Sequence, residues 1–146
     1  VSCPFMYDGT RYVPKIKEFA DECIRLGIDV TIGIIVRDKN INEAQQLRVR
    51  KEVTMPIALD YYYDNLLEYN THFLDHEAFF LHKSHYLKYI SKVLFYGIDF
   101  PIAYDNPNIM KFIDEDANHK YVKYVDEYWL DKEVLDGIRT KKERNI

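Results

Sequence analysis

The stretch "DVTIGIIV", residues 29–36, is almost continuously apolar and rich in β-branched side chains. A strand that is buried on both faces of a parallel sheet has this composition, because neither face meets water. A helical pattern precedes it at residues 13–26, where apolar residues recur every three or four positions, Pro14 suits the first turn and Gly27 suits the end. The stretch therefore predicts a buried strand that follows a helix, which is the repeating unit of an α/β fold.

The same alternation continues along the chain. The pattern predicts strands at residues 1–5, 29–36, 54–61, 77–82, 100–105 and 120–125. It predicts helices at residues 13–26, after Asn40, and at 64–74, 85–97, 108–114 and 129–138. We therefore expect an α/β fold with a doubly wound, mostly parallel, Rossmann-like sheet and helices on both of its faces. Residues 1–139 are expected to form this single domain, and residues 140–146 a charged C-terminal tail.

The composition narrows the class of function. The chain has 146 residues, of which 47% are hydrophobic, so we expect a folded domain. Its formal net charge of −4 does not favour direct binding of nucleic acid by this domain alone. Cys3 and Cys23 lie in apolar runs and form no CxxC pair, which is typical of reduced cysteines in a cytoplasmic protein. We expect no membrane partner, because no run of twenty apolar residues is present.

Cations follow several of the expected strands, although the chain is acidic overall. Ligands bind parallel α/β sheets beyond the carboxyl ends of the strands. Arg11 follows the first strand, and Lys88 and Lys92 share one face of a helix that follows the fourth. Ser84 is a candidate N-cap of that helix, whose N-terminus favours anions. These four residues predict a phosphate-binding site.

Three further residues are candidates for the same site. Gly9 lets the backbone turn tightly, and Lys83 and His85 flank Ser84 in "LHKSH". The common alternative is that each is a turn residue, a solvated cation or a structural histidine. We expect no metal and no cofactor, and the sequence identifies no catalytic residue.

Two longer segments, "FMYDGTRYVPKIKEF" at residues 5–19 and "HEAFFLHKSHYLKYISKVLFYGIDFPIAYDN" at residues 76–106, suggest a family. They resemble the C-terminal, nucleotide-binding half of GT-B glycosyltransferases, with phage-encoded DNA glucosyltransferases as the nearest likeness. The resemblance implies a UDP-sugar donor, held at its diphosphate by Arg11, by Lys88 or Lys92, and by Ser84. It also implies a separate acceptor domain or subunit as a partner.

One departure from that family keeps other functions open. Its members hold the ribose with a glutamate on the helix before a Gly-Pro element, and the matching segment at residues 91–97 contains no acid. One alternative is a non-catalytic α/β interaction module with a tyrosine-rich surface. Another is a small nucleoside-processing enzyme of the deoxyribosyltransferase type, which the early "SCPF" resembles. That class needs a glutamate nucleophile near "YGIDFPIAY", and none is present there.

Overall fold

The computed structural model describes residues 2–94, 106–114, 118–126 and 128. The strands are β1 (Phe5–Tyr7), β2 (Thr10–Tyr12), β3 (Thr31–Val36) and β4 (Asn70–Asp75). The helices are α1 (Ile16–Arg25), α2 (Lys39–Arg50), α3 (Met55–Asn65), α4 (His76–Leu94), α5 (Pro107–Asp114) and α6 (His119–Val122).

The strands of the described residues form two separate pairs. β1 and β2 form an antiparallel hairpin in which Met6 pairs with Arg11. β3 and β4 lie parallel and in register along their whole length, from Thr31 beside Asn70 to Val36 beside Asp75. A Cβ atom added to Gly33 would lie 3.0 Å from Cδ1 of Leu74, so the glycine of β3 leaves room for the Leu74 side chain of β4.

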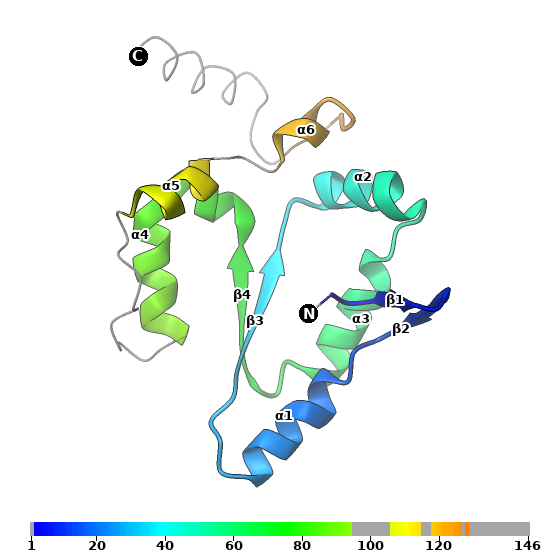
Figure 1. Ribbon diagram of the computed structural model, residues 1–146, viewed down its shortest axis with the longest axis vertical. Coiled ribbons are helices and arrows are strands. Elements are labelled where there is room, and N and C mark those ends of the chain that lie inside the picture. Colours follow the sequence, from blue (N-terminus) through cyan, green and yellow to red (C-terminus); the bar gives the residue numbers. More distant parts are fainter. Residues whose placement is uncertain (1, 95–105, 115–117, 127, 129–146) are drawn as a thin grey trace.

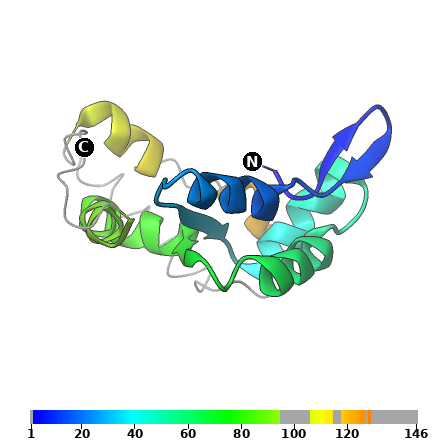
Figure 2. The ribbon, with the colours of Figure 1, turned by 90° about the horizontal axis from the view of Figure 1, so that it is seen from below.

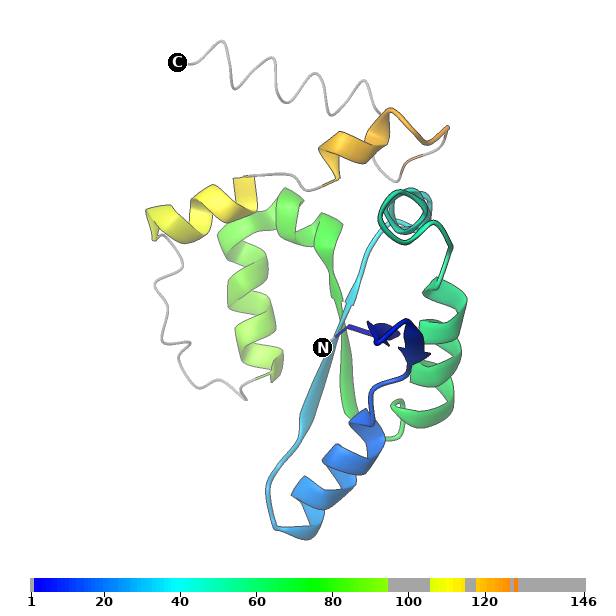
Figure 3. The ribbon, with the colours of Figure 1, turned by 45° about the vertical axis from the view of Figure 1, so that its right-hand side comes forward.

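The β3–β4 pair separates two groups of elements. Figure 1 shows α4 and α5 on one side of it and the hairpin, α2 and α3 on the other. The views in Figures 2 and 3 agree that the hairpin and α4 lie far apart. No helix in the described ranges is long and apolar enough to span a bilayer.

The expected doubly wound, mostly parallel sheet is wrong, because the described residues contain only two sheets of two strands each. The residues expected to form the third strand, 54–61, instead begin α3. Pro56 lies in the first turn of that helix, where a missing N–H leaves no hydrogen bond unmade. The segment expected to form the next helix, 64–74, contains the end of α3 and most of β4.

Two more segments expected to form strands contain helix instead. Residues 77–82 belong to α4, because Asp75 accepts a hydrogen bond from the backbone N–H of Ala78 at 2.8 Å and starts the helix directly after β4. Of residues 120–125, Lys120–Val122 belong to the short helix α6, a turn follows, and Tyr121 and Val125 both pack on Ile41. The strand expected at 100–105 and the helix expected at 129–138 lie outside the described residues.

Other local predictions are observed. α1, β3, α2 and α5 lie where the sequence patterns predict them, and the second part of α4 covers most of the helix expected at 85–97. The expected strand at 1–5 is replaced by the hairpin, which begins at Phe5. Its turn residues, Asp8 and Gly9, have φ angles of 49° and 72°. An Asp-Gly turn with two positive φ angles matches the twist of a tight hairpin.

Candidate functional site

A pocket of about 340 Å³ lies between the hairpin and the connection from α2 to α3. The N-terminal side contributes Phe5 and Arg11, and the connection contributes Arg50, Glu52 and Thr54. We call this the hairpin pocket. Its volume is within the range of small-molecule sites, and it combines apolar and charged walls in the way such sites do.

Two guanidinium groups reach the hairpin pocket. Arg11 forms an ion pair with the Glu52 carboxylate, and Arg50 donates from Nη1 to the Thr54 hydroxyl at 2.6 Å. The side chains of Arg11 and Glu52 are 33% and 47% exposed, so water reaches the pair. The charged lining therefore holds two cations and one carboxylate, which favours an anionic ligand.

The corner between α2 and α3 is held rigidly. α2 ends at Arg50, and its C-cap residue, Lys51, adopts the left-handed conformation with a φ of 64°. The side-chain oxygen of Gln46 accepts hydrogen bonds from the backbone N–H groups of Thr54 and Met55, at 2.7 and 2.9 Å. Thr54 is buried. These contacts fix the corner from which Arg50, Glu52 and Thr54 line the pocket.

The hairpin side is anchored to α3 through Cys3 and Tyr62. The two side chains hydrogen-bond, and burial is the main cause that raises the pKa of the Cys3 thiol. Burial, with the nearby Cys3, raises the pKa of Tyr62 to about 12 from its ordinary value of 10. The neutral phenol is thus the form that the folded chain prefers at this contact.

This contact predicts a loss of stability in alkali. Above about pH 10 the unfolded chain ionises Tyr62 while the folded chain keeps it neutral, so the stabilisation is complete below pH 10 and is lost as the pH rises towards 12. The urea midpoint of the wild-type chain should fall more steeply between pH 9 and pH 11.5 than that of Tyr62→Phe. Tyr63→Phe alters an exposed tyrosine of the same helix, retains Tyr62 and should follow the wild type. Equal slopes for wild type and Tyr62→Phe would contradict the assignment.

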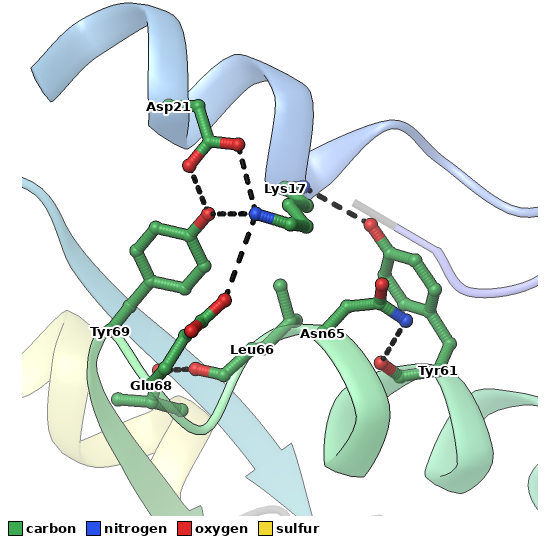
Figure 4. A network of polar contacts seen from close by, with 8 residues as sticks. Lys17, Asp21, Tyr61, Asn65, Leu66, Glu68 and Tyr69 are labelled. Atoms are coloured by element: carbon green, nitrogen blue, oxygen red, sulfur yellow. Dashed lines mark hydrogen bonds and ion pairs between the residues drawn. The ribbon is translucent and has the colours of Figure 1, made fainter. Parts of the chain in front are cut away.

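A polar cluster holds α1 against the end of α3 (Figure 4). Lys17 donates from Nζ to Asp21 at 2.9 Å and to the Tyr69 hydroxyl at 3.1 Å, and Tyr69 in turn donates to Asp21. The backbone N–H of Lys17 donates to the Tyr61 hydroxyl at 3.1 Å. The hydrogen bonds to Tyr69 and Asp21 raise the pKa of Lys17, which therefore stays cationic. A cationic lysine is no nucleophile, so this cluster is a clamp that positions α1 and the hairpin before it.

The structure does not bring the expected diphosphate residues together. Arg11 is a β2 residue in the hairpin pocket, whereas Ser84, Lys88 and Lys92 belong to α4, on the far side of the β3–β4 pair (Figure 1). Lys88 and Lys92 are exposed on one face of α4. They lie on the other side of the β3–β4 pair from Arg11 (Figure 1).

The three further candidates are also dispersed. Gly9 lies in the hairpin turn and does not line the pocket. Lys83 has φ and ψ of 48° and −124°, so α4 consists of two helical segments that join there. Ser84 and the exposed His85 follow this break, which matches the helix start that the sequence predicts near Ser84.

The carboxyl ends of β3 and β4, where ligands bind in many α/β sheets, are filled by a buried polar network. Asn118 donates from Nδ2 to Glu77 at 2.6 Å and to the Tyr128 hydroxyl at 3.0 Å, and it accepts from Nε of Arg37. The backbone N–H of Asp38 also donates to Glu77, at 3.1 Å. Glu77 and Asn118 are both buried. Protein groups therefore occupy the place that the strand-end rule assigns to a ligand.

Sequence reasoning missed Phe5, Arg50, Glu52 and Thr54. It searched the loops after strands, whereas Arg50 ends a helix and Glu52 and Thr54 follow it. A cation in the last turn of a helix is common because it meets the helix dipole, so Arg50 carried no distinct signal. The nearest available signal was the Asp8-Gly9 turn, which predicts a hairpin and would have placed Arg11 on a strand.

No protein-family model matches the chain, and neither a curated protein nor a solved structure shows significant similarity to it.

Proposed function

We propose that the chain binds a nucleotide diphosphate in the hairpin pocket, as the donor-binding part of a UDP-sugar glycosyltransferase. The observation that carries the proposal is the convergence of two guanidinium groups, Arg11 and Arg50, on one pocket that an aromatic ring, Phe5, also lines. Guanidinium groups form paired, charge-assisted hydrogen bonds with phosphate oxygens.

Each lining group has a role that suits this ligand. Arg11 and Arg50 bind the two phosphates, and the Thr54 hydroxyl, already within 2.6 Å of Arg50, lies where it can donate to a phosphate oxygen. Phe5, whose ring stacks on Tyr12 with centroids 5.8 Å apart, offers a flat apolar wall to a base. The pocket thus meets both the charged and the aromatic parts of a nucleotide.

Glycosyl transfer would use the same charges. As the bond between sugar and diphosphate breaks, negative charge grows on the departing phosphate, and fixed cations stabilise it. Arg11 and Arg50 would supply this stabilisation. The proposal includes a separate acceptor domain or subunit, which would provide the base and the acceptor site.

The test is calorimetric titration of UDP and of UDP-glucose into the wild-type chain and into Arg11→Ala. Loss of a charge-assisted hydrogen bond should weaken binding by about 1.5–3 kcal/mol. Arg25→Ala is the matched control, because it removes an exposed arginine that pairs with Glu22 on α1, away from the pocket. Lys88→Ala tests the α4 cations in the same way.

Two results would contradict the proposal. One is the absence of heat with either nucleotide at millimolar concentration, which means an affinity weaker than about −4 kcal/mol. The other is nucleotide binding that Lys88→Ala weakens and Arg11→Ala leaves unchanged, which would place the site on α4.

A second candidate function, a non-catalytic interaction module, is favoured by one specific observation. Large apolar side chains are exposed on both sheet and helix: Ile35 of β3 is 76% exposed and Phe19 of α1 is 71% exposed. Another protein that packs on these side chains would remove their apolar surface from water. Failure to bind any nucleotide, together with self-association in sedimentation that Phe19→Ser reduces, would favour this function over the first.

A further inference from the structure

The two guanidinium groups of the hairpin pocket differ in the partner that each one has. Arg50 donates to a neutral hydroxyl, that of Thr54. Arg11 is paired with a carboxylate, Glu52, which lines the same pocket. A carboxylate and a phosphate offer a guanidinium the same kind of charged oxygen. Glu52 therefore occupies the position at Arg11 that an oxyanion of the ligand would take.

We propose that Glu52 determines the ligand class of the hairpin pocket, as an internal competitor for Arg11 that only a polyanionic phosphate replaces effectively. This inference rests on the proposed function, because it concerns the same site. With Glu52 in place, the charged lining of the pocket carries two cations and one anion. A monoanion that displaces Glu52 exchanges one partly exposed ion pair for another and gains little.

A diphosphate gains more from the same exchange. One phosphate replaces the carboxylate at Arg11, and the charge of the other reaches Arg50, which lines the same pocket. The ligand thus forms a second charged contact that Glu52 does not make in the unliganded chain. Ligands with at least two negative charges are therefore the class that this pocket accepts.

Release of Glu52 is easy for the protein to accommodate. Its side chain is 47% exposed, so the displaced carboxylate regains water without a change in the fold. It lies next to Lys51, the left-handed C-cap residue of α2, in the turn that leads to α3. The competition thus affects binding while the pocket walls stay in place.

The experiment is a double-mutant cycle, with UDP and inorganic pyrophosphate titrated separately into each chain. Glu52→Gln should raise the association constant of both ligands about twofold to fivefold, the worth of a partly exposed ion pair. In the Arg11→Ala background, Glu52→Gln should leave the association constant unchanged, because the guanidinium for which Glu52 and the ligand compete is absent. In the Arg50→Ala background, Glu52→Gln should still raise the association constant by a similar factor, although both ligands bind more weakly there. Glu43→Gln, which removes a carboxylate paired with Lys39 at the other end of α2, controls for net charge.

Each outcome decides between the two proposals. Binding of UDP that Arg11→Ala weakens and Glu52→Gln leaves unchanged would overturn the role of Glu52 and leave the proposed function standing. An equal gain from Glu43→Gln would also overturn it, since net charge alone would explain the effect. Binding that is measurable only in Glu52→Gln would support the role of Glu52. Absence of binding in the wild type and in Glu52→Gln alike would overturn both proposals.

Discussion

Asn118→Ala is expected to lower the free energy of unfolding by about 3–5 kcal/mol. Asn118 is 1% exposed and joins three groups at the ends of β3 and β4: it accepts from Arg37 and donates to Glu77 and Tyr128. Alanine would remove one of the donors of the buried Glu77 carboxylate, which keeps the backbone N–H of Asp38, and one of the acceptors of Arg37, which also donates to Gln45. A buried charge that loses part of its hydrogen bonding has a less favourable solvation energy.

Urea unfolding followed by circular dichroism measures this effect. Two further variants test whether it comes from the buried polar network. Asn108→Ala removes an exposed asparagine of α5 and should change the unfolding free energy by less than about 0.5 kcal/mol. Asn118→Asp keeps the shape and places an oxygen opposite Glu77, where the donor now stands at 2.6 Å. It keeps the acceptor for Arg37 and removes the donors to Glu77 and Tyr128, so Asn118→Asp should also lower the free energy of unfolding although it opens no cavity. An unchanged midpoint for Asn118→Ala would contradict the network.

Local patterns could be predicted from the sequence, and long-range pairing could not. The β-branched run at residues 29–36 gave β3, and helical spacing gave α1. The same run also reads as a strand buried on both faces, yet Ile35 is 76% exposed and only β4 lies beside β3 in the described residues. The number of strands in a sheet depends on contacts between distant segments, which periodicity within one segment does not record.

Composition rich in apolar and aromatic residues was misleading in short segments. "KYVKYV" at 120–125 suggests a strand, but its first three residues belong to α6, and Tyr121 and Val125 pack on Ile41. In six residues a period of 2 and a period of 3.6 share several positions, so tertiary contact decides between them. The same ambiguity affected residues 77–82, where the N-cap at Asp75 decides for the helix.

The candidate site could be predicted in part. Arg11 was singled out as a cation that follows the first expected strand, and it lines the pocket although it lies within β2. Its neighbours in the pocket, Arg50 and Glu52, come from a different part of the sequence and meet Arg11 only through the fold. The cations of α4 carried a similar signal in the sequence, yet the fold places them on the other side of β3 and β4 (Figure 3). Charge at strand ends indicates a site only where the expected sheet forms.

Ile41→Ala is expected to lower the free energy of unfolding by about 2–5 kcal/mol. Ile41 is fully buried in a largely polar helix, α2, and packs on Tyr121 and Val125. Arg37 and Arg48 lie over the Tyr121 ring, with Cζ at 5.6 and 5.9 Å from its centroid. Loss of the isoleucine side chain would therefore open a cavity at the contact that holds the residues of α6 to α2.

The measurement is again urea unfolding, with Leu47→Ala as the control on the same helix. Leu47 is 50% exposed, so its truncation removes less buried surface and should lower stability by less than Ile41→Ala. Ile41→Val should fall between the wild type and Ile41→Ala, at about 0.5–1.5 kcal/mol. Equal effects of Ile41→Ala and Leu47→Ala would contradict the role of Ile41 as the anchor of α2.

The double variant Ile41→Ala/Asn118→Ala tests whether the two contacts act together. Asn118 is the N-cap residue of α6, and Ile41 packs on the same short helix through Tyr121. If either substitution alone detaches α6 from α2, the second finds part of its contact already lost. The loss for the double variant should then be smaller than the sum of the two single losses by about 0.5–3 kcal/mol. Additive losses would show that the polar network and the apolar contact hold α6 independently.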